Sequence, residues 1–251
     1  MEKSQRVQAA ALDAPWARTA PAQVTRELIV CGLLGACMDL YTRRTVTGRE
    51  RLAELSGPVI FVANHASHMD TPALLRALPS PWRRRTLVAA AADYFYRDPR
   101  VAALVSLAFG TVGLERRGGG LGGGAAGHVD GLIAEGWSLV MFAEGTRSRN
   151  GSVGRLHSGA AVLAARHDLP IVPVHLSGTH AAMPTGRRWM QRKRGARHRI
   201  GVRFGAPIHP RAGETATGVM ERVRLFLAEC GAATTPDPRA RTEPDLSVYA
   251  P

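Results

Sequence analysis

The chain has 251 residues, a formal net charge of +13 at pH 7 and 45% hydrophobic residues. This length allows one sizeable core and at most two domains, and the apolar content excludes a wholly disordered chain. Its three cysteines lack the spacing of metal ligands, which argues against a disulfide framework and indicates a reducing compartment.

The positive charge comes almost entirely from arginine, because lysine occurs only at Lys3 and Lys193. Such a surface suits phosphates, anionic lipid headgroups or acidic carrier proteins. A general arginine bias without a specific partner is the competing interpretation. A nucleic-acid partner is not expected, because aromatic residues make up only 6% of the chain and no recognition motif is present.

The first 44 residues divide into two segments of different composition. Residues 1–25 are polar, alanine-rich and interrupted by prolines, lack the features of a signal peptide, and are predicted to be disordered. Residues 28–38 are the most hydrophobic stretch but are shorter than the roughly 20 residues that span a bilayer. We therefore expect residues 26–44 to form a membrane-associating helix at the cytoplasmic face of the cell membrane, in a peripheral or monotopic protein. A helix packed on the domain is the alternative.

Apolar strands alternate with helical patterns over residues 57–210, which predicts an α/β fold. The strands are expected near 59–63, 86–91, 111–114, 139–143, 171–176 and 200–204, and the helices near 72–78, 100–109, 125–135, 160–166 and 218–229. We assign residues 45–231 to one domain and residues 232–251 to a disordered tail, because the tail is rich in Pro, Thr and Arg.

A first candidate site follows the apolar stretch at 58–63, where Asn64, His65 and Asp70 occur in the pattern Asn-His-x4-Asp. Thr71 is expected to cap the next helix, and ligands bind at such strand-to-helix corners in open α/β sheets. A carboxylate on one imidazole nitrogen would make the other nitrogen a base for a hydroxyl proton. A loop histidine with an aspartate that accepts from helix amides remains equally open.

A second candidate site follows the predicted buried strand 139–143, where Glu144, Gly145, Thr146 and Arg147 occur in succession. Glycine lets the backbone approach a ligand closely, and the amides, hydroxyl and guanidinium could bind phosphate oxygens. Glu144 could orient an arginine or accept from a substrate hydroxyl. A Glu–Arg pair that closes an ordinary turn is the alternative.

Other segments carry weaker signals. Arg116 follows the predicted strand 111–114 and could clamp a phosphate or simply be solvated. The glycine run 118–124 contains a formal G-x-G-x-x-G, but we interpret it as a flexible loop. Residues 187–199 hold seven cations around Trp189, and this segment is either a solvated loop or a patch that touches anionic lipid or a phosphorylated donor.

Four ordered blocks together resemble the 1-acyl-glycerol-3-phosphate acyltransferase family, within the wider glycerolipid and lysophospholipid acyltransferases. They are Asn-His-x4-Asp at 64–70, a Gly-to-Arg strand at 110–116, Glu-Gly-Thr-Arg-Ser at 144–148 and Pro-Ile-Val-Pro at 170–173. The resemblance covers roughly residues 45–210. Two positions depart from it, since Ala143 replaces the usual proline and His157 replaces a basic residue that is usually lysine.

The resemblance implies a mixed, largely parallel sheet flanked by helices and a role in phospholipid biosynthesis. The expected reaction moves an acyl group from acyl-CoA or acyl-carrier protein to the free hydroxyl of a lysophospholipid, most commonly 1-acyl-glycerol-3-phosphate, to give phosphatidate. Neither a cofactor nor a metal is implied, and an anionic membrane surface is an expected partner. In this assignment His65 is the general base and Asp70 orients it, while the substrate-binding residues are Asn64, Arg116, Glu144, Gly145, Thr146 and Arg147. Amides near the first block, or a neighbouring donor, would stabilise the oxyanion.

Three alternatives remain open at this point. Another lysolipid, such as a lyso-aminolipid or a glycolipid precursor, would use similar blocks. A metal-dependent hydrolase would use His65, His68 and Asp70 as ligands, although the spacing matches no established metal motif. A non-catalytic basic membrane-binding protein would keep the fold without the chemistry.

Overall fold

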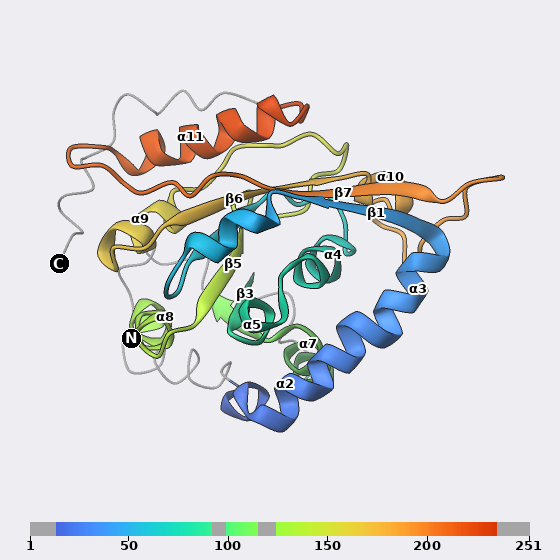
Figure 1. Cartoon of the computed structure of the whole chain (residues 1–251), viewed down its shortest axis with the longest axis horizontal. Helices are drawn as coiled ribbons and strands as arrows, with labels where there is room; N and C mark the ends of the chain where they lie inside the picture. Colours follow the sequence, from blue (N-terminus) through green and yellow to red (C-terminus); the bar gives the residue numbers. More distant parts are fainter. Residues whose placement is uncertain (1–13, 92–98, 115–123, 235–251) are drawn as a thin grey trace.

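The computed structural model describes residues 14–91, 99–114 and 124–234. Seven strands form one sheet in the order β1-β7-β6-β2-β5-β3-β4, and helices cover both faces of it (Figure 1). Every neighbouring pair is parallel except β6 and β7, which confirms the predicted mixed, largely parallel sheet. The strands are β1 (Thr42–Thr47), β2 (Ile60–Ala63), β3 (Thr86–Ala91), β4 (Thr111–Leu114), β5 (Ser138–Phe142), β6 (Ile171–Ser177) and β7 (His198–Phe204).

The helices predicted from the sequence are present, with boundaries that differ by no more than a few residues. They are α4 (Asp70–Ala77), α7 (Pro99–Phe109), α8 (Gly124–Ala134), α9 (Gly159–Arg166) and α11 (Ala216–Glu229). The further helical segments are η1 (Pro15–Arg18), α2 (Ala20–Glu27), η2 (Leu28–Leu33), α3 (Leu34–Tyr41), η3 (Arg49–Glu54), α5 (Ser80–Arg84) and α10 (Thr179–Ala182).

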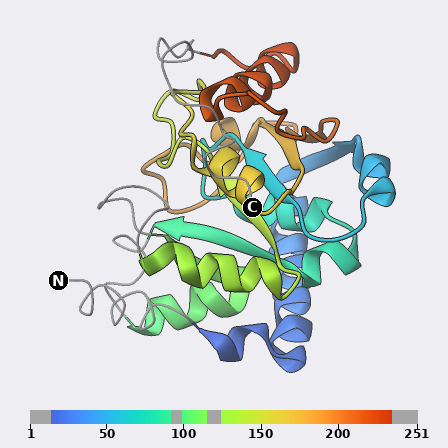
Figure 2. The same ribbon diagram turned by 90° about the vertical axis from the view of Figure 1, so that its left-hand side faces the viewer.

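The core lies in two layers, one on each face of the sheet. Along β2, Ile60 and Val62 pack with α8, α9 and α11, whereas Phe61 and Ala63 pack with α4 and with η2 and α3 near the N-terminus. Figure 2 shows α11 and the N-terminal helix on opposite sides of the molecule. Because β2 is buried on both faces, it is apolar at every position rather than alternating, as expected for a central parallel strand.

Strand β1 was not predicted, because residues 42–44 were assigned to the end of the membrane-associating segment 26–44 and strands were expected only from residue 57 onward. It is an edge strand with the sequence Thr-Arg-Arg-Thr-Val-Thr, in which only Thr42 is buried. An edge strand faces solvent and tolerates charge, so it lacks the apolar signal of the central strands. The helix therefore ends at Tyr41 and the chain enters the sheet directly.

The predicted disorder of residues 1–25 is wrong for residues 15–18 and 20–25, which are helical, while residues 1–13 lie outside the described part of the chain. From Ala20 to Tyr41, α2, η2 and α3 follow one another without a break, and we call this unit the N-terminal helix. The buried Arg26 anchors it, because its guanidinium donates to the carbonyls of Ala17 (2.6 Å), Ser106 (3.1 Å) and Leu107 (3.1 Å).

The other face of the N-terminal helix is apolar and exposed. Its leucines Leu28, Leu33 and Leu40 are 67%, 72% and 62% exposed. The packed face and the exposed face thus correspond to the two interpretations that the sequence left open. Over the described residues, the structure has no helix with the length and apolar character needed to cross a membrane.

The assigned tail begins within the fold rather than beyond it. Val153 and Thr234 form an isolated parallel bridge, and the amide of Val153 donates to the carbonyl of Ala233 at 2.8 Å. The expected disorder is therefore wrong for residues 232–234. Residues 235–251 are outside the described ranges.

Candidate active site

The turn after β2 brings His65 and Asp70 into contact. Nδ1 of His65 lies 2.8 Å from Oδ2 of Asp70, and the same oxygen accepts the amides of Ala66 and Ser67 at 2.7 Å each. Asp70 is fully buried, so these donors hold its carboxylate in one position. Because Asp70 accepts, Nδ1 of His65 carries the hydrogen and Nε2 is the nitrogen with a lone pair.

The His65 ring is held from a second side by Phe142, the last residue of β5. The two rings stack with centroids 4.0 Å apart and an interplanar angle of 19°. The His65 side chain remains 18% exposed. The imidazole is therefore fixed by stacking and by Asp70, while part of it stays accessible.

Helix α4 begins two residues earlier than predicted. Asp70 is its first residue and Met69 its N-cap, so Thr71 is not the cap. The Asp70 carboxylate lies in the first turn of the helix, where a negative charge is favoured, and turns back to the amides that precede the helix. This is why the carboxylate meets His65 although the two residues are five apart.

Asn64 has a structural role that the sequence did not indicate, and its expected substrate contact stays a prediction. Its side chain is buried, Nδ2 donates to the carbonyl of Leu176 at 2.9 Å, and Oδ1 accepts the amide of Leu176 at 2.8 Å. These two bonds join the end of β2 to β6. The asparagine therefore positions the turn that carries His65.

Glu144 joins the two candidate sites. Its Oε1 accepts the amide of His65 at 2.9 Å and its Oε2 accepts the amide of Gly154 at 2.8 Å. The pKa of Glu144 is raised, because burial raises it by more than the two amide hydrogen bonds lower it. Each oxygen is thus already bound to the backbone, so the side chain supports the His65 turn in addition to any substrate contact.

Three amides of the turn are not available for an oxyanion. The N–H of His65 donates to Glu144, and those of Ala66 and Ser67 donate to Asp70. The expected stabilisation by amides near the first block is therefore wrong for these three groups. A neighbouring donor would be needed instead.

The loop after β5 contributes Thr146 to the lining of a cavity of about 400 Å³, whereas Gly145 and Arg147 are not among the residues that line it. Gly145 has a φ of +66°, and a Cβ there would lie 3.3 Å from the ring of His157. The lining is mostly polar and includes Glu144, Thr146, Ser148, Asn150, Arg155 and His157. Hydroxyls and basic groups of this kind suit an anionic ligand.

Two further groups affect the electrostatics of the site. The pKa of His68 is lowered, first because burial disfavours its charged form and then because the positive charge of Arg147 is near. Arg116 lies outside the described residues. The strand before it, β4, belongs to the parallel part of the sheet, so it ends at the same edge as β2 and β5.

The metal-site alternative gains no support from the geometry of this turn. Oδ2 of Asp70 accepts three N–H groups, one of them from His65. Within the ranges that the structure describes, His, Cys, Asp and Glu do not gather in any group of three or more that could hold a metal ion.

A segment that the sequence did not indicate packs over the His65 turn. Ser67 Oγ donates to the carbonyl of Met183 at 2.8 Å, and Thr185 Oγ1 donates to the carbonyl of Ser148 at 2.8 Å. His180 Nδ1 lies 3.1 Å from the carbonyl of Ala66. These contacts join residues more than a hundred positions apart in two of the three cases, so no local pattern could have revealed them.

The fold and the His–Asp turn place the chain in a defined class. A family model described as Acyltransferase matches residues 43–177, and the chain belongs to this family. It is 30% identical over 155 residues to the 1-acyl-sn-glycerol-3-phosphate acyltransferase BAT2, chloroplastic, of Brassica napus. This alignment covers 61% of this chain and 43% of the relative. It is 28% identical over 198 residues to LPAT1, chloroplastic, of Arabidopsis thaliana, a 1-acyl-sn-glycerol-3-phosphate acyltransferase, with 78% and 52% covered.

The aligned part thus spans about half the length of these two relatives. The crystal structure of the 1-acyl-sn-glycerophosphate (LPA) acyltransferase PlsC from Thermotoga maritima is also similar. The TM-score is 0.63 at 20% sequence identity, with 89% of this chain and 85% of the other covered. This likeness shows that the two proteins share a fold.

Proposed function

We propose that the protein is an acyltransferase that moves a fatty acyl group from a thioester to the free hydroxyl of a lysophospholipid. The observation that carries this proposal is the His65–Asp70 pair, with Nδ1 bound at 2.8 Å and Nε2 left as the base. The printed names of the relatives support 1-acyl-glycerol-3-phosphate as the acceptor and phosphatidate as the product. Both molecules belong to phospholipid biosynthesis.

In the proposed reaction, Nε2 of His65 takes the proton of the acceptor hydroxyl as its oxygen attacks the thioester carbon. The tetrahedral intermediate then collapses, the ester forms, and the thiolate leaves with the proton that the imidazolium returns. Asp70 holds the tautomer and stabilises the imidazolium while it exists. No nucleophile from the protein and no cofactor or metal is required for this sequence of steps.

The acceptor phosphate is proposed to bind at the loop after β5. Thr146 and Arg147 supply a hydroxyl and a guanidinium there, Gly145 allows close backbone approach, and Arg116 would add a second guanidinium. Because Arg147 already lowers the pKa of His68, its charge acts on the His65 turn as well.

The donor, location and partners follow from the same proposal. The thioester is acyl-CoA or acyl-carrier protein, which carry the same reacting group. A lipid acceptor resides in a bilayer, so we propose that the protein works at the cytoplasmic face of the cell membrane without spanning it. The exposed leucines of the N-terminal helix and the net charge of +13 support contact with an anionic surface.

The test is acyl transfer from labelled long-chain acyl-CoA to lysophosphatidate in detergent micelles, with wild type beside His65→Ala. We expect phosphatidate from wild type and a loss on the order of 10²-fold or more in the variant. Histidine-dependent product only with another lysolipid would keep the mechanism and change the acceptor. Absence of transfer to every acceptor, from both acyl-CoA and acyl-carrier protein, would favour the non-catalytic membrane-binding protein.

A further inference from the structure

The segment between α10 and β7 is the most basic part of the chain. We call residues 186–197 the arginine loop. Its six cations are all exposed: Arg187, Arg188, Arg192, Lys193, Arg194 and Arg197. The sequence has no acidic residue between Asp168 and Glu214, so the loop carries its charge without a counter-ion nearby in the sequence.

The arginine loop adjoins the end of the N-terminal helix. Trp189, which is 58% exposed, donates from Nε1 to the hydroxyl of Tyr41 at 3.4 Å. Arg197 donates to the backbone carbonyl of Asp39 at 2.9 Å. A hollow of about 190 Å³ between the two segments is lined by Leu40, Tyr41, Arg192, Lys193 and Ala196.

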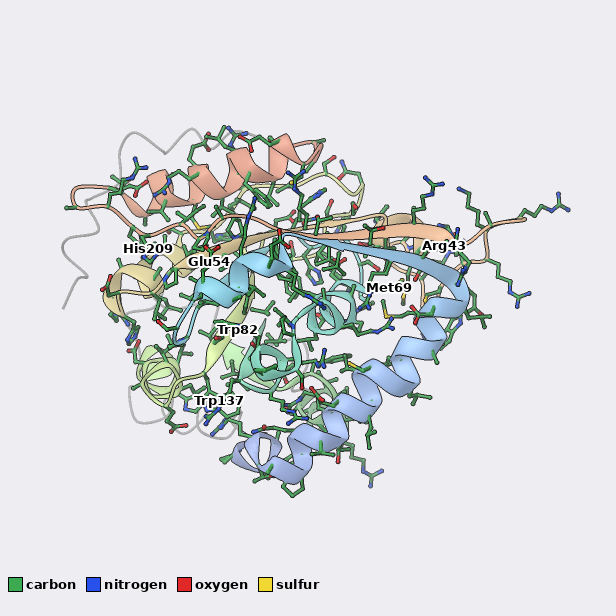
Figure 3. The ribbon with its side chains drawn as sticks, in the orientation of Figure 1. Arg43, Glu54, Met69, Trp82, Trp137 and His209 are labelled. Atoms are coloured by element: carbon green, nitrogen blue, oxygen red, sulfur yellow. The ribbon has the colours of Figure 1, made fainter. Side chains whose placement is uncertain are left out.

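The basic surface continues into the edge of the sheet. Arg43 of β1 pairs in register with Arg199 of β7, and both side chains are exposed. Figure 3 labels Arg43 at this end of the sheet, where nitrogen-tipped side chains project away from the body of the molecule. Cationic, aromatic and aliphatic side chains are thus exposed together on one part of the surface.

We propose that the arginine loop, with Arg43 and the Leu40–Tyr41 end of the N-terminal helix, is a docking surface for an anionic lipid bilayer. Guanidinium groups bind headgroup phosphates, and an exposed tryptophan beside a leucine suits the boundary between headgroups and acyl chains. An acidic protein would match the charge alone. The bilayer also matches the apolar face that runs on through Leu33 and Leu28.

The docking surface is joined directly to the candidate active site. Immediately before the arginine loop, Met183 accepts from Ser67 and Thr185 donates to Ser148, both at 2.8 Å. Docking of the loop therefore holds the His65 turn near the lipid surface. This inference deepens the proposed function, because a lysophospholipid could then react without leaving the bilayer.

The test compares two double variants of the full chain that change the charge equally. Arg192→Glu with Arg194→Glu alters the arginine loop, and Arg49→Glu with Arg211→Glu alters exposed arginines beyond the far ends of β1 and β7. Binding to sucrose-loaded vesicles is measured by sedimentation with 30% phosphatidylglycerol in phosphatidylcholine and with phosphatidylcholine alone. Thermal unfolding and transfer activity in detergent micelles are measured for each protein.

We expect the loop variant to bind the anionic vesicles about ten-fold or more weakly, and the control variant to bind within two-fold of wild type. Both should unfold at the wild-type temperature and keep activity in micelles. Unchanged vesicle binding by the loop variant would overturn the proposal, and so would an equal loss in both variants. A loop variant that binds vesicles normally but acyl-carrier protein weakly would assign the surface to the carrier. Because vesicle binding needs no turnover, these results are independent of whether the acyltransferase assignment holds.

Discussion

At the scale of single residues, two carboxylates fix the geometry of His65 from inside the fold. Asp70 binds the ring at Nδ1 and the amides of Ala66 and Ser67, and Glu144 binds the amide of His65 itself. Asp70 belongs to α4, and Glu144 follows β5. His65 is therefore positioned by residues from two different corners of the sheet.

Asp70→Asn tests the pairing with the imidazole. The asparagine keeps the size of the side chain but no longer favours a hydrogen on Nδ1 and no longer balances the charge of an imidazolium. We expect kcat to fall by roughly 10²- to 10⁴-fold, with little change in KM for the acceptor. Steady-state kinetics in micelles, with circular dichroism to confirm folding, measure this. Full activity in a folded variant would remove the paired role of Asp70.

Glu144→Gln tests the support of the turn. A glutamine can accept only one of the two amides and presents an N–H group to the other, so we expect a loss of about 1–3 kcal/mol in the free energy of unfolding. Urea denaturation measures it, and kcat should fall with it because His65 loses its anchor. Glu135→Gln, at an exposed position, is the control. Unchanged stability with a raised KM for lysophosphatidate would instead make Glu144 a substrate ligand.

The sequence reveals only part of this arrangement. The contact between His65 and Asp70 was predictable, because strand, turn and helix bring residues five apart together. The contacts of Asn64 with Leu176 span 112 positions and depend on β2 lying beside β6, which no local pattern states. Because the sequence alone does not show this pairing, the structural role of Asn64 was missed.

At the scale of elements, the N-terminal helix is held by one buried cation. Arg26 donates to two carbonyls at the end of α7, where positive charge is favoured by the helix dipole, and burial lowers its pKa to about 10. Gly110 has a positive φ, and a Cβ there would lie 2.9 Å from the guanidinium carbon. The glycine that opens the second sequence block therefore also makes room for Arg26.

Arg26→Met removes these bonds while keeping much of the apolar stem. The carbonyls of Ala17, Ser106 and Leu107 lose their donor, so we expect the free energy of unfolding to fall by about 2–4 kcal/mol. Arg49→Met, at an exposed position, should change it by less than about 0.5 kcal/mol. Denaturant titration compares the two variants. Equal stability of both would show that Arg26 does not anchor the helix.

Elements with two buried faces were easier to predict than elements at the margin. The central strands β2, β5 and β6 consist largely of apolar residues, so their existence and approximate limits follow from composition. β1 is polar and gains its structure from pairing with β7, 156 positions away by the register of Thr42 with His198. Its assignment required the tertiary fold.

At the scale of the whole molecule, the N-terminal helix packs on the core with one face and exposes the other face to the surroundings. One face contributes Arg26, Val30 and Met38 to the buried interior, while the opposite face exposes leucines. Deletion of residues 1–40, which would test membrane contact in a purely superficial helix, would here also uncover the core below it. Loss of membrane association in such a truncation would therefore not distinguish a missing anchor from a damaged fold.

Substitutions on the outer face avoid this difficulty. Leu33 is 72% exposed, so Leu33→Ser should leave the thermal unfolding temperature nearly unchanged, whereas a leucine inserted in a bilayer interface gains about 1.5–3 kcal/mol from burial. We expect vesicle binding to weaken about ten-fold, and further when Leu28→Ser is added. Leu225→Ser alters an exposed leucine of α11, across the sheet, and should bind as wild type. If Leu33→Ser and the double variant with Leu28→Ser bind vesicles as tightly as wild type and Leu225→Ser do, the N-terminal helix only packs on the domain.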